Sequence, residues 1–508
     1  MEKIFVSGFS SKIFIDVFNS REFKKKHEIV GWCLDKYLIK DLKNKNKFID
    51  IFDIHFCIRG FEPSQKTLKN TEKIELNCKK IFYDNYNQFI NLFSRVDPEN
   101  IFNLYNRETY IKQIINAWHH YIILKNIKTI FLFYTPHLIH DFAIYQIAKL
   151  LKLKIIILES TKYIRTYFFI NKIEQLPYFE KLTLNKVHKR AHDKFEIKKF
   201  LENRKKITSS YISDIKNYQK REAIKYKLGI LYYIYLFIRT LLSPSKKLFN
   251  KNSIIWTYKK ENYLSLKNLV SEKDNLIFSI KNNLTNKTLD KKYTKMCSKI
   301  NLDIKYIYYS GSLLPEKSTI PDAINNYNDI ENIRLIREVF GKKIPIYYKI
   351  HPLSFIGNNI SHNYIDEISF KTIADMDNIK LVNYNFNQAD LVKNSFFNAT
   401  ISGDIGIESV LNNKPCILFG NTWFANCEGN FIIRDVSDLI NFKNKINHLK
   451  IDIKKFKKKI YHKIYKKTFS LKYNDSYPLY DKDETSNFKN KKDYNKYIQE
   501  IIKIFKNI

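Results

Sequence analysis

The hydrophobic positions of the N-terminal part predict short strands separated by helices. The runs Lys3–Gly8 and Glu28–Leu34 are apolar, and Phe48–Phe56 alternates apolar with polar residues, as β-strands do. The amphipathic stretch Arg107–Leu124 predicts a helix. The apolar run Thr129–Tyr134 after it is typical of a parallel strand that is covered on both faces. This pattern indicates an α/β domain.

A strand-helix-strand unit follows. The turn Thr135–Asp141 leads into a helix that begins near Phe142, and the apolar run Lys154–Glu159 comes after the helix. Two strands with a crossover helix between them form the building block of a doubly wound parallel sheet. Basic residues from about 176 to 250 then interrupt the alternation, which predicts a helical insertion.

The C-terminal half repeats the alternation, with helices predicted at Asp329–Phe340 and after Gly403. Strands are predicted at Lys305–Ser310, Ile344–Pro352, Asn378–Tyr384, Phe396–Ser402 and Cys416–Gly420. Because 508 residues are too many for one hydrophobic core, we predict two Rossmann-type α/β domains that face a cleft. We expect the first over 1–255, including the basic insertion, and the second over 256–508, including a helical tail.

The chain carries a formal net charge of +37, from 88 Lys and Arg against 51 Asp and Glu. Nucleic acid, an anionic membrane surface and phosphorylated small molecules all suit such a surplus. A base-composition bias in the gene explains it equally well, by spreading lysines over every solvated face. The sequence contains no P-loop, GxGxxG, zinc-finger or RNP-type motif, so we expect no nucleic acid partner.

The six cysteines are scattered and include no CxxC pair. Their spacing predicts neither a disulfide framework nor a zinc site, which favours a reducing compartment and a protein without metal or cofactor. Met1–Gly8 lacks the apolar core of a signal peptide, so we expect a cytoplasmic protein.

The longest apolar run, Leu228–Ile238, is shorter than the roughly 20 residues that cross a bilayer. Cations flank it at Lys225, Lys227, Arg239, Lys246 and Lys247. Over 226–249 this arrangement suits a helix lying on an anionic membrane, with peripheral contact at the inner face of the cytoplasmic membrane. A buried linker helix fits the same pattern, and both interpretations stay open.

The segment Ala399–Gly420 is the strongest local signal for a ligand site. A strand that runs into Ser402 and Gly403 brings backbone amides and a helix N-terminus to the carboxyl edge of the sheet, where open α/β sheets bind phosphate. Gly403 and Gly406 allow close approach of the backbone, and Glu408 offers a carboxylate to ribose hydroxyls. A plain turn with Asp404 as helix N-cap has the same pattern.

Two further segments carry candidate chemistry. Lys349 and His351 end a hydrophobic strand before Pro352, and an ammonium and an imidazolium suit the charge that develops on a leaving phosphate. Glu316, in the loop Leu313–Asp322, is a candidate general base. A solvated strand-end histidine and a solvated loop glutamate are the alternatives.

Together the three segments resemble bacterial capsular polysaccharide biosynthesis proteins and their transferases for the sugar acid Kdo, which are two-domain GT-B enzymes. The resemblance covers mainly Tyr306–Asn430. It rests on a Pro-Glu loop, a strand ending Lys-x-His-Pro, and a Ser-Gly-x-x-Gly-x-Glu turn, in matching order and spacing. The matching residues are Pro315, Glu316, Ser318, Thr319, Pro321, Lys349, His351, Pro352, Ser402, Gly403, Gly406, Glu408, Lys414, Pro415, Phe419 and Gly420. Asp404 departs from the family's Thr or Ser, and its carboxylate would repel a phosphate unless it turns away to cap the helix.

The resemblance implies a metal-independent GT-B glycosyltransferase that moves a sugar from a nucleotide-sugar to a growing surface polysaccharide or lipid-linked glycan. A CMP-linked sugar acid is the favoured donor, and UDP- and GDP-sugars also fit. The implied donor-binding residues are Lys349, His351, Ser402, Gly403, Gly406 and Glu408, and the implied catalytic residues are Glu316, His351 and Asp141. On the acceptor side the resemblance adds His137 and Glu159. A sugar-nucleotide epimerase of the same fold and a nucleic-acid-binding protein stay open as alternatives.

Overall fold

The computed structural model divides the chain into two compact units. Unit 1 consists of Met1–Glu196 and His462–Ile508, and unit 2 consists of Ile197–Tyr461. The residues that the structure describes are 1–35, 38–45, 49–54, 57, 63, 76–95, 97, 102–161, 166–183, 194–206, 231, 234, 235, 238, 272–324, 326–355, 363–471 and 490–506. Most of the insertion expected at about 176–250 lies outside these residues. The division places 197–255 in unit 2 and the C-terminal tail in unit 1, whereas the sequence analysis expected one boundary after residue 255.

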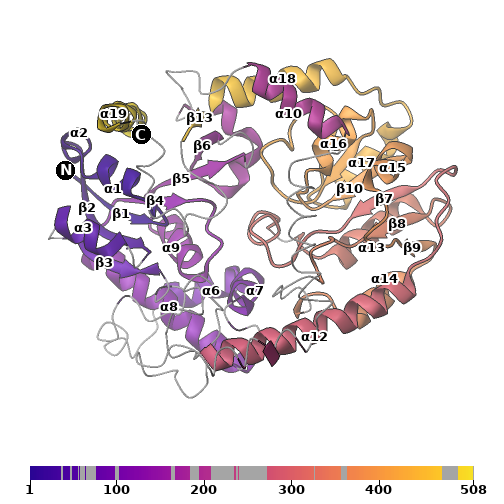
Figure 1. Ribbon diagram of the computed structural model, residues 1–508, viewed down its shortest axis with the longest axis horizontal. Helices are drawn as coiled ribbons and strands as arrows, with labels where there is room; N and C mark the ends of the chain where they lie inside the picture. The colour runs from indigo at the N-terminus through magenta and orange to yellow at the C-terminus, as the bar shows by residue number, and fades with distance from the viewer. Residues whose placement is uncertain are drawn as a thin grey trace. The chain divides into compact units, whose positions relative to one another are not determined.

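The tail belongs to unit 1 because its apolar side chains complete the core of that unit. β13 (Phe469–Ser470) pairs antiparallel with β6 (Thr166–Ile170). α19 (Lys491–Lys506) lies against α1 (Lys12–Phe18), although the two helices are at opposite ends of the chain (Figure 1). Phe505 of α19 is fully buried, and its ring contacts aromatic rings of α1. Sequence order alone gave no sign of this return.

Unit 1 is built on a sheet whose described strands follow the order β13-β6-β5-β4-β1-β2-β3. The strands not yet given are β1 (Glu2–Ser7), β2 (His27–Leu34), β3 (Asp50–Asp53), β4 (Thr129–Phe133) and β5 (Lys154–Ser160). β1 to β5 are parallel, and β6 is antiparallel to β5. α9 (Ile139–Leu150) packs on β4 and β5, and α8 (Leu104–Leu124) packs on α9. The parallel strands therefore end at one common carboxyl edge.

Unit 2 is built on a parallel sheet whose described strands follow the order β12-β11-β10-β7-β8-β9. The strands are β7 (Ile307–Ser310), β8 (Ile346–Lys349), β9 (Ile379–Leu381), β10 (Phe397–Thr400), β11 (Cys416–Leu418) and β12 (Asn430–Ile432). α13 (Asp329–Phe340) connects β7 to β8, and α16 (Ile405–Leu411) connects β10 to β11. Buried aromatic and aliphatic residues from these strands form the core of the unit.

Both units place their own first strand at the centre of the sheet. Numbered from that strand, the unit 2 sheet has the order 3-2-1-4-5-6 of a doubly wound Rossmann fold, and the unit 1 sheet has the same order with β13 added beyond the antiparallel β6. The prediction of two Rossmann-type α/β domains is therefore confirmed. The order reverses between β1 and β4 in unit 1 and between β7 and β10 in unit 2. Open α/β sheets bind ligands outside the carboxyl ends of the strands at such a switch point.

The remaining helices connect or cover these sheets. They are α2 (Arg21–Lys24), α3 (Ile39–Lys45), α6 (Leu76–Asp84), α7 (Tyr86–Ser94), the 3₁₀ helix η2 (Ile173–Lys181), α10 (Lys194–Lys206), α12 (Glu272–Met296), α14 (Glu367–Ala374), α15 (Gln388–Asn394), α17 (Val436–Ile446) and α18 (Ile453–Lys467). Among the described residues, none of the helices is long and apolar enough to span a bilayer.

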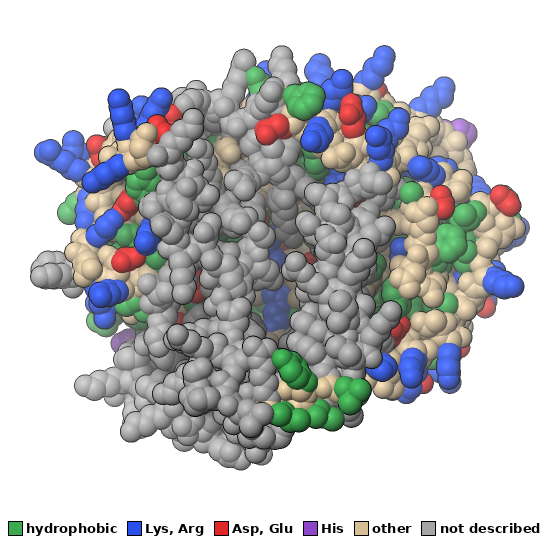
Figure 2. Space-filling view, viewed as in Figure 1, with side chains coloured by type: hydrophobic (Ala, Val, Ile, Leu, Met, Phe, Trp, Pro, Cys, Tyr) green, Lys and Arg blue, Asp and Glu red, His purple; other side chains and the backbone are tan. Residues whose placement is uncertain are grey.

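The positive charge is widely distributed. Figure 2 shows Lys and Arg side chains spread over the visible described surface, without a single dominant patch. The surplus therefore does not mark one binding surface on this face. Of the apolar segment 226–249, the structure describes Leu231, Ile234, Tyr235 and Ile238, which are helical and exposed. Their spacing places them on one face of a helix.

Candidate functional site

Two of the three motif segments meet at the switch point of unit 2. The Pro-Glu loop follows β7 and the Ser-Gly turn follows β10, which is the neighbouring strand. Ser402 Oγ donates a hydrogen bond of 2.6 Å to the carbonyl oxygen of Ser318, and Ser318 Oγ donates one of 3.1 Å to Glu316 Oε2. The candidate base and the candidate phosphate turn are thereby joined through Ser318.

Local hydrogen bonds hold the Pro-Glu loop in shape. The buried Thr319 hydroxyl donates to the carbonyl oxygen of Glu316 over 2.8 Å, and the Glu316 amide lies 3.2 Å from the same hydroxyl. Lys317 forms an ion pair of 2.8 Å with the buried Asp322. The carbonyl oxygen of Asp322 accepts a hydrogen bond from the amide of Asn421, just after β11. Glu316 is therefore carried by an anchored loop, with its side chain half-buried.

Lys349 is the last residue of β8 and is almost completely buried. Its Nζ donates a hydrogen bond of 2.8 Å to the carbonyl oxygen of Phe386. Burial lowers the pKa of Lys349 to about 8, against the opposing effect of the Glu408 carboxylate. The ammonium is thus a cation near the neutral range of pH, at the end of the strand next to β7.

His351 is a neutral hydrogen-bond donor in this structure. Its Nδ1 lies 3.2 Å from the backbone amide of Leu353 and accepts that hydrogen. A neutral ring that accepts at Nδ1 carries its proton on Nε2. Burial lowers the pKa of His351 and Lys349 lowers it further, while Glu316 acts in the other direction. The sequence-based expectation of an imidazolium is therefore replaced by a neutral Nε2–H donor.

Glu408 lies in α16 and is buried. Its Oε1 accepts from Arg204 Nη1 over 3.1 Å, and its Oε2 accepts from Gln388 Nε2 over 3.0 Å. Burial raises the pKa of Glu408, and the positive charges of Arg204 and Lys349 oppose this. Each carboxylate oxygen accepts up to two hydrogen bonds. A ribose hydroxyl that binds Glu408 must therefore share these oxygens or displace one of the two side chains.

Arg204 was missed by the sequence analysis. It lies in the last turn of α10, is buried, and also contacts Asp404 Oδ2 with Nη2 over 3.0 Å. Asp404 occupies the N-cap position of α16 but makes no side-chain cap hydrogen bond. The alternative in which the Asp404 side chain caps the helix is therefore not seen, and its carboxylate forms an ion pair with Arg204 instead. No signal in the basic run Glu202–Lys206 distinguishes Arg204 from its neighbours.

The two glycines of the turn differ in their surroundings. A Cβ added to Gly406 would lie 2.7 Å from Phe424 Cε2 and 3.2 Å from Asn430 Oδ1. Gly406 therefore allows α16 to pack closely on Phe424 and Asn430. This packing explains the glycine, and no bound ligand is needed to explain it. A Cβ on Gly403 would lie 3.0 Å from Thr400 Oγ1, on a half-buried turn. Gly403 remains the glycine that a phosphate would approach.

The acceptor-side candidates lie around the switch point of unit 1. Asp141, in the first turn of α9, accepts a hydrogen bond of 2.6 Å from Ser7 Oγ. Glu159 is buried at the end of β5 and accepts from the amide and the hydroxyl of Thr135, which fixes the turn after β4. His137 Nδ1 lies 3.0 Å from the carbonyl oxygen of Thr135. The hydrogen bonds to Thr135 give Glu159 a structural role, whereas Asp141 stays a candidate catalytic residue.

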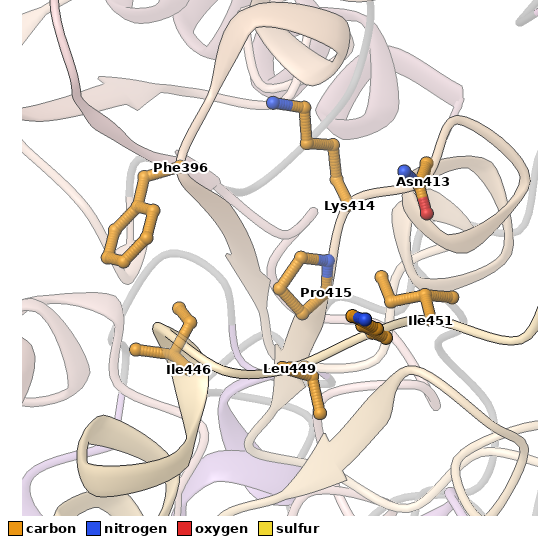
Figure 3. Close-up of a pocket in the computed structure, with 8 residues that line it drawn as sticks. Phe396, Asn413, Lys414, Pro415, Ile446, Leu449 and Ile451 are labelled. Atoms are coloured by element: carbon orange, nitrogen blue, oxygen red, sulfur yellow. The ribbon is translucent and has the colours of Figure 1, made fainter.

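A pocket at the other edge of the unit 2 sheet is a different feature. It encloses about 350 Å³ and is shown in Figure 3. Its lining residues are Phe396, Asn413, Lys414, Pro415, Ile446, Leu449, Lys450 and Ile451. Phe396 and Pro415 directly precede β10 and β11, so the pocket lies at the amino edge of the strands. Open α/β sheets bind their ligands at the opposite edge.

No protein-family model matches the chain, and no curated protein matches it. Solved structures do. KpsC, a β-Kdo 2,7 transferase from Thermosulfurimonas dismutans, is 9% identical, covers 86% of this chain and 89% of its own, and has a TM-score of 0.28. UDP-GlcNAc 2-epimerase from Methanocaldococcus jannaschii, in complex with UDP-GlcNAc and UDP, is 12% identical, covers 90% and 96%, and has a TM-score of 0.25. MnaA from S. aureus with UDP is 11% identical, covers 98% of both chains, and has a TM-score of 0.20. Matches at these values carry no argument about activity.

Proposed function

We propose that this chain is a GT-B-type glycosyltransferase that binds a nucleotide-sugar at the carboxyl edge of the unit 2 sheet. The observation that carries the proposal is the meeting of Glu316, Ser318 and Ser402 at the switch point, with Lys349 ending the next strand. These residues belong to segments that are far apart in the sequence and that share one family's pattern.

Charge complementarity supports an anionic donor. The Lys349 ammonium and the Nε2–H of His351 are hydrogen-bond donors that suit phosphate oxygens. The resemblance favours a CMP-linked sugar acid as the donor. We place the acceptor, a growing glycan or lipid-linked glycan, at the carboxyl edge of unit 1 near Asp141.

In the proposed reaction, Glu316 takes the proton of an acceptor hydroxyl as a general base. The acceptor oxygen forms a bond to the anomeric carbon of the donor sugar. The bond from that carbon to the phosphate oxygen breaks, and the nucleotide leaves with the electron pair. Lys349 and His351 stabilise the negative charge on the leaving phosphate.

A panel of nucleotides and nucleotide-sugars tests the donor site by thermal stabilisation, because a ligand that binds the folded form raises its apparent stability. CMP, UDP, GDP and UDP-GlcNAc are included, together with a transfer assay on glycan acceptors. Stabilisation by one nucleotide and transfer of its sugar support the proposal. Conversion of UDP-GlcNAc without an acceptor would identify an epimerase, and steeply salt-dependent nucleic acid binding without transfer would identify a nucleic-acid-binding protein.

Glu316→Gln tests the catalytic assignment. Loss of a general base lowers kcat by about 10²- to 10⁴-fold, whereas the donor KM stays nearly unchanged. Glu338→Gln is the matched control, since Glu338 is exposed on α13. If only the donor KM of Glu316→Gln rises, Glu316 binds the donor and the base lies elsewhere, with Asp141 the next residue to replace.

A further inference from the structure

Two cysteines and a histidine lie together at the carboxyl edge of the unit 1 sheet. Cys33 Sγ is 3.3 Å from Cys57 Sγ and 3.7 Å from His140 Nε2. The three atoms lie within 4.8 Å of one another, and all three side chains are fully buried. Neither the donor site nor the acceptor candidates account for this cluster.

The topology explains why residues so distant in sequence meet. Cys33 is the penultimate residue of β2, and its Cα is paired with that of Ser7 at the end of β1. His140 lies in the first turn of α9, which follows β4. Cys57 comes shortly after β3. Because these strands are parallel neighbours, their carboxyl ends converge at the switch point of the sheet.

We propose that Cys33, Cys57 and His140 form a binding site for a zinc ion. Zinc bonds of about 2.3 Å to sulfur and about 2.1 Å to nitrogen put tetrahedral ligand atoms roughly 3.5 to 3.8 Å apart. The Sγ–Nε2 separation of 3.7 Å falls in this range, and the Sγ–Sγ separation of 3.3 Å lies slightly below it. Thiolate and imidazole ligands select zinc over magnesium, calcium and manganese, which prefer oxygen.

The charge of the site fits its burial. Two thiolates and a neutral imidazole balance the two positive charges of zinc, and the adjacent Asp141 carboxylate, which accepts the hydrogen bond of Ser7 Oγ, adds one negative charge. The Trp118 ring from α8 lies 6.5 Å from the His140 ring and contributes an apolar cover. An apolar shell of this kind limits the access of water to a metal.

Asp141 lies beside the proposed metal position. Its Oδ1 is 3.2 Å from His140 Nε2 and accepts the hydrogen bond of Ser7 Oγ. Three protein ligands with one open position are the composition of catalytic zinc sites, whereas structural sites have four protein ligands. We infer that a water fills the open position and that Asp141 accepts a hydrogen bond from this water. This inference does not depend on the proposed transferase activity.

Zinc content measures the site directly. The full chain is purified without a metal-chelating tag, loaded with zinc under reducing conditions and dialysed against metal-free buffer. Elemental mass spectrometry then measures the zinc content per chain. We expect about one zinc ion per wild-type chain and at least a fivefold lower content in Cys33→Ser and Cys57→Ser. Cys416→Ser is the matched control, because Cys416 is an equally buried cysteine in unit 2. It should keep the wild-type content.

Cobalt provides a readout that needs no variant. Wild-type chain loaded with cobalt should show the ligand-field bands of a tetrahedral site and a thiolate-to-metal charge-transfer band, and zinc should displace both. Circular dichroism establishes that the cysteine variants are folded. Equal zinc in the wild type and in Cys33→Ser with Cys57→Ser, or the absence of the charge-transfer band, would overturn the proposal. A wild-type chain without zinc whose mass and peptide map show a disulfide between Cys33 and Cys57 would also overturn it, in favour of a redox pair.

Discussion

The carboxyl edges of the two sheets occupy the same position in the same strand order but carry different chemistry. At the edge of unit 1, Cys33, Cys57 and His140 gather soft donor atoms in a fully buried cluster. At the edge of unit 2, Arg204 pairs with Asp404 and Glu408, and the Lys349 ammonium donates a hydrogen bond to the carbonyl oxygen of Phe386. Burial is common to both edges and each carries an ion pair, whereas the two thiols belong to the first edge alone.

The difference separates what the fold supplies from what the side chains supply. A Rossmann-type strand order positions a ligand edge, but it does not select the ligand. In unit 2 the candidate residues for ligand selection are Lys349 at the end of β8, Arg204 of α10 and Glu408 of α16. In unit 1 they come from β2, the segment after β3, and α9. Each edge therefore has its own candidate ligand chemistry.

Replacing Arg204 should have the largest effect. Arg204→Met leaves Glu408 and Asp404 without their cationic partner, and the loss of one member of a buried ion pair costs about 3 to 5 kcal/mol. Urea unfolding measures the loss. Lys463→Met in unit 1 is the matched variant, because Lys463 is fully buried and pairs with Glu180 over 2.7 Å.

The two variants should differ in ligand response. Lys463→Met should lose similar stability but keep the stabilisation by nucleotide, whereas Arg204→Met should lose both. Asp404→Asn removes only the more exposed of the two carboxylates and serves if Arg204→Met does not fold. Unchanged nucleotide stabilisation in a folded Arg204→Met would remove Arg204 from the candidate site.

Titration of Lys349 should have the next largest effect. Its pKa is lowered in the folded chain to about 8, so between about 8 and the ordinary value the unfolded chain binds the additional proton. Stability contributed through Lys349 therefore rises with pH across this window, by up to about 3 kcal/mol relative to Lys349→Met. Nucleotide affinity should fall over the same window, because the ammonium is lost.

Urea unfolding and nucleotide titration from pH 7 to 10 measure both trends. Lys371→Met is the control, since Lys371 is exposed on α14. A nucleotide affinity that is independent of pH in the wild type would mean that Lys349 does not contact the phosphate.

The fold was largely readable from the sequence, for a physical reason. Apolar runs such as Thr129–Tyr134 and the spacing of Asp329–Phe340 have clear strand and helix periods, and the structure has β4 and α13 there. The strands β6, β12 and β13 were not predicted, whereas the equally short β9 and β11 lie in longer apolar runs that were recognised. The return of the tail to unit 1 depends on packing and leaves no local signal.

The sequence predicts the location of a candidate site residue only where that residue ends a strand. Parallel strands bring Lys349 and Ser402 to one edge, so their common location followed from the pattern. The pairing of Arg204 with Glu408 spans 204 residues, and Cys33 and His140 are 107 residues apart. Contacts at such separations arise from tertiary packing, and one sequence carries no spacing rule for them. The zinc proposal therefore could not have come from cysteine spacing.

Gly406→Ala tests whether packing or ligand approach explains that glycine, and its effect should be intermediate. The added methyl meets Phe424 at 2.7 Å, and overpacking of this kind costs about 1 to 3 kcal/mol. Gly403→Ala should cost less, because the nearest atom lies at 3.0 Å and not at 2.7 Å. Thermal unfolding with and without nucleotide measures both. A stable Gly406→Ala that has lost nucleotide binding would show that Gly406 serves the ligand after all.

The smallest effect is expected at the exposed residues of 226–249. It tests whether an anionic membrane is the partner of the net positive charge. Leu231, Ile234, Tyr235 and Ile238 share one apolar face, and cations flank this segment in the sequence. If 226–249 lies on a membrane as one interpretation of the sequence has it, this face should bind anionic lipid. Ile234→Ser should weaken binding to anionic vesicles several-fold, which corresponds to about 1 kcal/mol.

Sedimentation with vesicles measures this binding. It should require anionic lipid and weaken as salt is raised, because each cation near the surface adds about 1 kcal/mol that salt screens. Ile368→Ser is the matched control, since Ile368 is an exposed isoleucine on α14 and should leave binding unchanged. If the wild-type chain stays in the supernatant with anionic vesicles at low salt, the apolar face has another partner. The positive charge would then contribute to nucleotide-sugar binding at the carboxyl edge of the unit 2 sheet, or it would only keep the surface hydrated.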